Sequence, residues 1–163
     1  MKTKNEYMLP VSREAIIQIN KGEKGSPKSH IDWRKTKYKY GDERQAIDFF
    51  CPEGTKIFAA QDGEVVWIKN DFEKGGLNKK YIAKANGLTI RHTNGEYTNY
   101  LHLQKGSIPI KPGDKVKKGD LIGKVGMSGW TPAPHLHFSV FRIYGPNPQT
   151  DYETLEVDFK ELK

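Results

Sequence analysis

The sequence predicts a single all-β domain, either a two-layer sandwich or a folded barrel. Its 163 residues suit one compact domain and are too few for two ordinary ones. Short runs rich in β-branched and aromatic residues alternate with turn signals that contain glycine, proline, asparagine or aspartate. No segment keeps a helical hydrophobic period over three turns, so strands must supply the core.

The expected strands follow one another along the chain with turns between them. Residues 1–45 are a polar and basic N-terminal extension, in which loops surround one short strand, 15–20. Residues 46–145 are the core of the domain, and residues 146–163 are a C-terminal tail. The core strands are expected at 46–50, 56–60, 64–68, 88–92, 97–103 and 136–143, with two more short strands after Gly-Asp turns within 112–123.

Charge and hydropathy limit the classes of partner. Lys and Arg outnumber Asp and Glu by 27 to 20, and the net charge of +7 favours anionic partners such as nucleic acid, phospholipid or an acidic wall polymer. Residues 33–40 alternate cations with aromatic rings, which can bind single-stranded nucleic acid, but an exposed β-hairpin with amphipathic packing is the preferred interpretation. A nucleic-acid-binding module is therefore the weakest alternative. No apolar run approaches the roughly 18 residues of a membrane-spanning helix, and residues 1–10 show no export signal.

The single cysteine, Cys51, limits the possible metal chemistry. One cysteine excludes an internal disulfide framework and a pair of cysteine ligands. Any metal site must therefore use histidine and carboxylate side chains. Cys51 lies among Phe49, Phe50 and Pro52, and we expect a buried, unreactive thiol there rather than a nucleophile.

Two histidines open the last expected strand. The alternation of a strand puts His135 and His137 on one face, and Leu136 and Phe138 on the other. Two imidazoles on one face suit a metal ion, although two polar residues on a solvated face would show the same pattern. The preceding Pro-Ala-Pro segment, 132–134, is stiff and fixes where the strand begins, which favours the metal site.

Asp48 and His102 are the other candidate site residues. Asp48 has four apolar neighbours at the end of an expected strand, so its carboxylate must be paired with a cation or bound to a metal. His102 is expected to share a strand face with Tyr100, while Leu101 and Leu103 point to the core. A single histidine in a strand is more often structural, so His102 alone indicates little.

The motifs that surround these residues resemble a known family. They are Ala46-Ile47-Asp48-Phe49, Pro52 to Ala60, Asp62 to Val66, Tyr100-Leu101-His102-Leu103, Lys111 to Gly123, Gly126-Met127-Ser128-Gly129 and Pro134-His135-Leu136-His137-Phe138. In order, spacing and identity, these segments of residues 46–141 resemble the lysostaphin and LytM type of zinc endopeptidase.

The resemblance implies a fold, an activity and roles for four residues. The fold would be an all-β catalytic core of the duplicated hybrid type, with a zinc ion in a groove. The activity would be cleavage of short peptide bridges in bacterial peptidoglycan, often at glycine, by an exported, monomeric protein in the periplasm, on the outer surface or secreted. By position, Asp48 and His137 resemble the family's zinc ligands, and His102 and His135 its non-ligand catalytic pair.

Arg44 departs from the family pattern. The family usually places a histidine ligand four positions before the aspartate, and Arg44, whose cationic side chain cannot bind zinc, holds that position here. One interpretation is a catalytically silent domain of the same fold that binds wall fragments or activates another wall hydrolase. Arg44 would then fill the vacated ligand position and pair with Asp48.

The other interpretation is that an upstream histidine supplies the missing nitrogen. His92 belongs to a hairpin that turns away from the groove in the family, so we expect a solvated turn residue there. His30 follows Ser29, and this Ser-His pair resembles a branch of the family whose ligand lies farther ahead of the aspartate. Residues 31–45 would then be an insertion, and the preferred zinc ligands are His30, Asp48 and His137.

These residue types suit hydrolysis by a zinc enzyme. Two imidazoles and a carboxylate hold Zn²⁺ tetrahedrally and leave its fourth position for water. Bound zinc lowers the pKa of that water toward about 7 and polarises a carbonyl. His102 and His135 could then act as general base and oxyanion stabiliser, in an order that the sequence leaves open. The predicted function is zinc-dependent hydrolysis of peptidoglycan cross-links.

Overall fold

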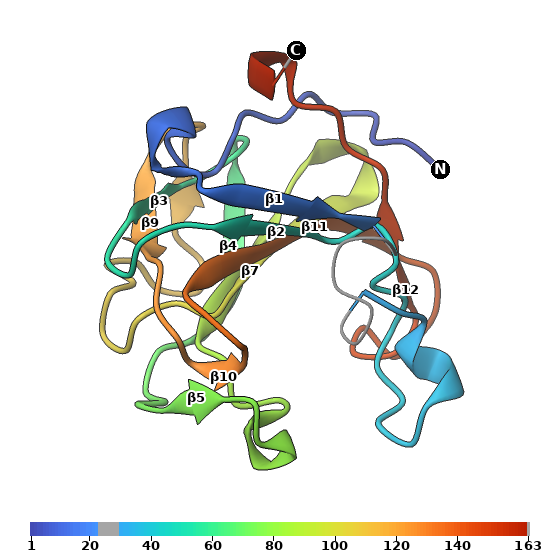
Figure 1. Ribbon diagram of the computed structural model, residues 1–163. Coiled ribbons are helices and arrows are strands. Elements are labelled where there is room, and N and C mark those ends of the chain that lie inside the picture. The colour runs from blue at the N-terminus through green and yellow to red at the C-terminus, as the bar shows by residue number, and fades with distance from the viewer. Residues whose placement is uncertain (23–29, 163) are drawn as a thin grey trace.

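The computed structural model describes residues 1–22 and 30–162 and is all-β, as the sequence predicts (Figure 1). Within these residues the helical segments are 3₁₀ turns of three residues each. The strands of the main sheet are β1 (Gln18–Lys21), β2 (Ile47–Phe50), β4 (Gly63–Lys69), β6 (Gly87–Arg91), β7 (Glu96–Leu101), β8 (Lys115–Val116), β11 (His135–Ile143) and β12 (Tyr152–Leu155).

The main sheet is antiparallel and open. Its order is β1-β2-β11-β7-β6-β4-β8, and β12 pairs with the far half of β11. The two ends of this order do not join, so the main sheet is not closed. Two small pairs accompany it, the antiparallel β3 (Lys56–Phe58) with β9 (Leu121–Lys124) and the parallel β5 (Gly75–Gly76) with β10 (Gly129–Trp130).

Strand β11 organises the core. Leu136, Phe138 and Val140 alternate along it toward one face, and all three are fully buried among the other core side chains. Burial of an aliphatic or aromatic side chain of this size contributes roughly 1.5–3 kcal/mol. The opposite face of β11 carries His135 and His137, so the alternation that builds the core also delivers two imidazoles to one place.

Segments at both ends of the chain pack on this core. Tyr7, Leu9 and Val11 belong to the same buried cluster as the central strands, and so do three residues near the C-terminus, Leu155, Val157 and Phe159. Figure 1 shows both termini on the same side of the sheet, and Lys160 pairs with Glu6 there at 2.7 Å. No sequence pattern indicated β12, which lies in the segment expected to be a tail.

The segment between His30 and β2 is a closed loop. An antiparallel bridge joins Asp32 to Asp42, so the two ends of the loop between them lie side by side. This loop begins with the 3₁₀ turn Trp33–Lys35. Edge-to-face contacts connect the Trp33 ring with Tyr38, Tyr40 and Trp130 at centroid distances of 5.7, 6.3 and 6.5 Å. The rings of this segment therefore pack on one another and on Trp130 of β10 while its lysines are exposed, which is the expected amphipathic packing. The expected β-hairpin is replaced by a 3₁₀ turn and loop.

The expectation for His92 was wrong. Its side chain is buried, with Nδ1 2.7 Å from the Asp62 carbonyl oxygen and Nε2 2.8 Å from the Thr98 hydroxyl. The Tyr7 ring packs on it edge to face. The N-terminal segment therefore covers a turn that would otherwise be solvated.

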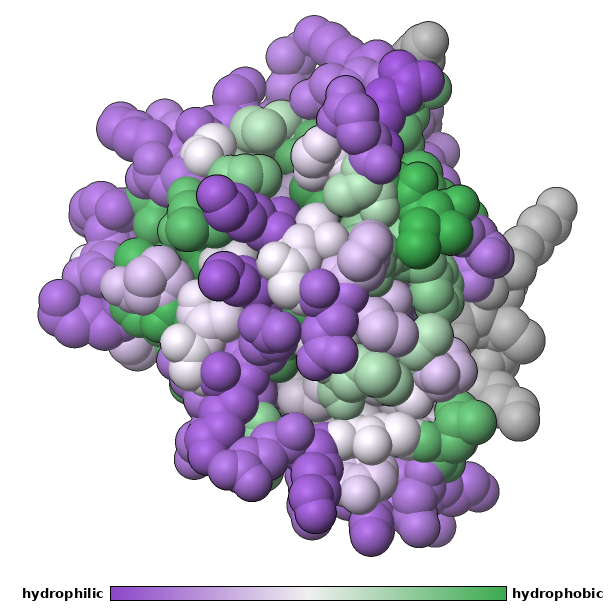
Figure 2. Space-filling model, turned by 60° about the vertical axis from the view of Figure 1, so that its left-hand side comes forward, coloured by the Kyte–Doolittle hydropathy of each residue, from purple (hydrophilic) through white to green (hydrophobic). Residues whose placement is uncertain are grey.

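The hydrophobic side chains on the face drawn in Figure 2 are scattered. Figure 2 shows one face of the molecule, on which hydrophilic side chains surround small, separate hydrophobic patches. Such isolated apolar residues are normal on a protein surface. Within the described part of the chain, no helix has the length and apolar character needed to cross a bilayer.

Candidate metal centre

Strand register brings Asp48 and His137 together. β2 and β11 are antiparallel neighbours in which His137 lies directly opposite Asp48, and paired side chains point to the same face. His137 Nδ1 lies 3.2 Å from Asp48 Oδ1, and Asp48 is only 2% exposed. The sequence motifs around these two residues thus meet in one buried place.

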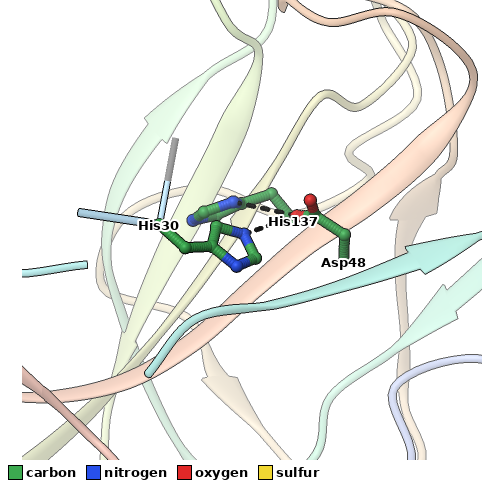
Figure 3. Close-up of side chains that lie close together, drawn as sticks. All are labelled: His30, Asp48 and His137. Atoms are coloured by element: carbon green, nitrogen blue, oxygen red, sulfur yellow. Dashed lines mark hydrogen bonds and ion pairs between the residues drawn. The ribbon is translucent and has the colours of Figure 1, made fainter. Parts of the chain in front are cut away.

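His30 reaches the same carboxylate from the start of the loop. Its Nε2 lies 3.1 Å from Asp48 Oδ1 (Figure 3). The His30 side chain is fully buried. The other ring nitrogen, Nδ1, lies 3.2 Å from the Gly22 carbonyl oxygen and can only donate to it. Nε2 is therefore the nitrogen that faces the Asp48 carboxylate, with which it makes a close contact but no regular hydrogen bond.

The three residues fit a metal ion. One ligand atom from each of His30, Asp48 and His137 lies within 4.8 Å of the others. Two imidazoles and one carboxylate form the donor set that zinc prefers in sites with one open position. The buried Nε2 of His30, directed at Asp48 Oδ1 without a regular hydrogen bond to it, is the observation that best fits a metal ligand.

The charges around His137 also favour a bound cation or proton at this site. Burial opposes the ionisation of Asp48, but the His137 and His30 rings outweigh it and hold the pKa of this carboxyl below its ordinary value. Burial likewise opposes a charged His137, yet Asp48 and Glu43 raise its pKa to about 10. Two buried carboxylates thus flank one ring, and either a proton or a metal ion must balance them.

His135 and His102 border this group. His135 Nδ1 lies 2.9 Å from the Ala133 carbonyl oxygen, and its Nε2 lies 3.5 Å from Asp48 Oδ1. His102 Nδ1 lies 2.7 Å from the Ser128 carbonyl oxygen, and its ring centroid is 4.6 Å from that of His135. Burial lowers the pKa of His135, and burial together with the neighbouring imidazoles lowers that of His102 to about 3. Both rings are therefore neutral near pH 7, with Nδ1 protonated and Nε2 free to accept a proton.

A left-handed backbone turns His102 into the site. Regular alternation would put His102 on the face of Tyr100, as the sequence predicted, but Tyr100 is a core residue and Leu101 lies on the site face opposite His137. The φ of His102 is +69°, a conformation that costs a non-glycine residue roughly 1–2 kcal/mol. This turn breaks the alternation after β7 and brings the ring to His135. The predicted grouping of Tyr100 with His102 is therefore wrong, because it assumed an unbroken strand.

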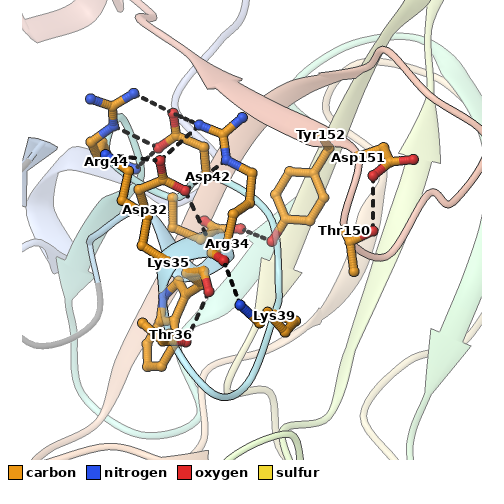
Figure 4. Close-up of polar contacts among 12 residues, drawn as sticks. Asp32, Arg34, Lys35, Thr36, Lys39, Asp42, Arg44, Thr150, Asp151 and Tyr152 are labelled. Atoms are coloured by element: carbon orange, nitrogen blue, oxygen red, sulfur yellow. Dashed lines mark hydrogen bonds and ion pairs between the residues drawn. The ribbon is translucent and has the colours of Figure 1, made fainter.

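Arg44 points to a different carboxylate. Its guanidinium donates to both oxygens of Asp42, from Nε at 2.9 Å and from Nη2 at 2.7 Å (Figure 4). Asp48 has histidines around it and no Lys or Arg partner among the described residues. The pairing of Arg44 with Asp48, which the silent-domain interpretation requires, is absent from that part of the chain.

Sequence reasoning missed Glu43 and Tyr152. Glu43 Oε2 lies 3.1 Å from His137 Nε2, and the Tyr152 hydroxyl donates to Glu43 Oε1 at 2.6 Å. Glu43 is an acidic residue in a basic segment, which is a weak signal, and Tyr152 lies in the expected tail. Only the fold brings them together, because 109 positions separate them in the sequence.

Comparison with known proteins identifies the family. A model of peptidase family M23 matches residues 42–150, which is more than half of the chain. The chain belongs to this family. The expected resemblance to zinc endopeptidases of the lysostaphin and LytM type is thereby confirmed.

Individual relatives support the same assignment. The peptidoglycan DD-endopeptidase ShyC of Vibrio cholerae is 34% identical over 136 residues, covering 76% of this chain and 28% of the relative. A zinc-containing peptidase from V. cholerae is 29% identical, with a TM-score of 0.57 over 83% of this chain and 36% of that one. The lysostaphin catalytic domain from Staphylococcus simulans is 25% identical, with a TM-score of 0.50 over 72% and 85% of the two chains. The chain thus spans about a quarter of the length of ShyC.

Proposed function

We propose that this M23 domain is a zinc-dependent endopeptidase that hydrolyses peptide cross-links of bacterial peptidoglycan. The observation that carries the proposal is the convergence of three ligand atoms from His30, Asp48 and His137 in one buried group. The DD-endopeptidase ShyC and a zinc-containing peptidase among the similar proteins support the substrate and the metal. A protein that acts on the bacterial cell wall is expected to be exported. The anionic polymers of the wall would also suit its net charge of +7.

The metal would be held by His30 Nε2, Asp48 Oδ1 and His137 Nδ1. Each imidazole has its other nitrogen bonded to an acceptor, Gly22 for His30 and Glu43 for His137. Zinc, when bound, supplies a Lewis acid that polarises the scissile carbonyl and lowers the pKa of a bound water.

His102 and His135 would provide general acid–base catalysis and stabilise the oxyanion. Both rings are neutral and are fixed by backbone carbonyl oxygens, so each has Nε2 available. One ring can accept the proton of the attacking water, and the protonated form can then donate to the leaving amine. The other can stabilise the negative charge that develops on the carbonyl oxygen. The protein is proposed to act as a monomer, because one chain contributes all five residues.

Digestion of purified peptidoglycan tests this proposal. The protein loaded with zinc should release cross-linked peptides with new amino termini, identified by mass spectrometry, and a chelator should stop the reaction. A protein that binds the wall but leaves every peptide bond intact when zinc is supplied would instead indicate the silent domain.

A further inference from the structure

Glu43 contacts the site from a side that the three ligands leave free. It is a carboxylate only 7% exposed, and its Oε2 lies 3.1 Å from His137 Nε2. The ring nitrogen that faces Asp48 is the other one, Nδ1. Glu43 therefore contacts one nitrogen of the His137 ring, Nε2, while the proposed metal ligand is the other nitrogen, Nδ1. This contact does not make Glu43 a fourth metal ligand.

His137 differs from the other three site imidazoles in its acceptor. The Nδ1 atoms of His30, His102 and His135 each meet a neutral backbone carbonyl oxygen, those of Gly22, Ser128 and Ala133. His137 meets a carboxylate instead. A charged acceptor forms a stronger hydrogen bond, fixes the ring and makes its other nitrogen a better metal ligand.

The fold holds Glu43 firmly against β12. The Tyr152 hydroxyl donates to Glu43 Oε1 at 2.6 Å, so both carboxylate oxygens have partners. The backbone on either side of Glu43 is also fixed, because Asp42 exchanges hydrogen bonds with Tyr152 and Thr154 at 3.1 and 3.0 Å. The Gln45 amide donates to the Thr154 hydroxyl at 2.9 Å. The loop and the last strand thus hold one carboxylate in place.

We propose that Glu43 is a positioning residue for the metal ligand His137 and that Tyr152 holds Glu43 in the orientation this requires. The proposal rests on the proposed function, since it takes His137 as a zinc ligand. It gives the segment 31–45 a second role beyond bringing His30 to the site. The last strand, β12, then takes part in metal binding without supplying a ligand.

Zinc affinity of Glu43→Gln tests the proposal directly. Glutamine keeps the size of the side chain and removes its charge. We expect zinc, measured by competition with a chromogenic chelator, to bind about 10- to 100-fold more weakly than in the parental protein. The visible spectrum of the Co²⁺-substituted variant should also shift, because the geometry at His137 changes.

Two further variants keep the test specific. Glu153 also lies on β12, and its carboxylate accepts a hydrogen bond from Arg142 Nε at 2.6 Å. Glu153→Gln removes this carboxylate charge and should keep the parental zinc affinity and cobalt spectrum. Tyr152→Phe leaves the Glu43 charge but removes the group that holds it, so its zinc affinity should fall by less than that of Glu43→Gln. This variant decides the question if Glu43→Gln does not fold.

Each outcome has one meaning. Parental zinc affinity and an unchanged cobalt spectrum in Glu43→Gln would overturn the positioning role while leaving the proposed function intact. If Tyr152→Phe folds and Glu43→Gln does not, a parental zinc affinity in Tyr152→Phe would also overturn the positioning role. A parental protein that binds no zinc would overturn the proposed function and this inference together.

Discussion

At the scale of single residues, the site depends on which nitrogen of each imidazole is occupied. His30, His102 and His135 donate from Nδ1, whereas His137 donates from Nε2. The sequence motifs identified Asp48, His102, His135 and His137 as a group, because each stands in a segment of recognisable order and spacing. They could not show the tautomers, which depend on carbonyl and carboxylate acceptors from other parts of the chain.

Replacing His102 should separate catalysis from metal binding. Its ring borders His135 but is not part of the three-residue ligand group. We expect His102→Ala to keep one equivalent of zinc while hydrolysis of a cross-linked wall peptide falls by about 10²-fold or more. Metal analysis checks the retained zinc, and a peptide-release assay checks the loss of hydrolysis. Unchanged turnover would show that the left-handed His102 is only structural.

The buried His92 should make stability depend on pH. Burial lowers its pKa from the ordinary 6.5, so the folded state takes up a proton less readily than the unfolded state. The contribution of His92 to stability is therefore complete above about pH 6.5 and is lost as the pH falls below it. Denaturant unfolding of the parental protein and of His92→Asn between pH 5 and 8 should show a weaker acid loss in the variant. Identical pH profiles would contradict this account.

At the scale of elements, β11 joins the core to the site. Its alternation places Phe138 in the core and His137 in the site, so the sequence could predict both from one pattern. It could not predict β12, because four residues show little periodicity and their pairing with β11 is decided by packing. The break at His102 was equally hidden, since residue type alone does not indicate a positive φ.

Two neighbours on β11 should respond to substitution in opposite ways. Phe138→Ala leaves a cavity among Phe49, Tyr100 and Phe159 and should cost about 3–5 kcal/mol. Ser139 Oγ is buried without a hydrogen-bond partner in the described structure, so Ser139→Ala should stabilise the fold by about 1 kcal/mol. Urea unfolding measures both. A destabilised Ser139→Ala would mean that the hydroxyl has a partner, such as a bound water.

At the scale of the whole molecule, one buried site collects side chains from widely separated segments. His30 and Glu43 come from the loop before β2, Asp48 from β2 and His137 from β11, with Tyr152 behind them on β12. The resemblance to the family predicted the all-β core and zinc chemistry but left the first ligand open, because Arg44 holds its usual position. Only the path of the loop brings His30 to Asp48.

Zinc content measured for the parental protein and for His30→Ala tests the central claim most directly. The account predicts one tightly bound zinc per parental chain and its loss, together with wall hydrolysis, in His30→Ala. The control is Arg44→Ala, which should keep both, because the Arg44 guanidinium pairs with Asp42. A His30→Ala protein that retains a full equivalent of zinc and cuts peptidoglycan at the parental rate would contradict the account.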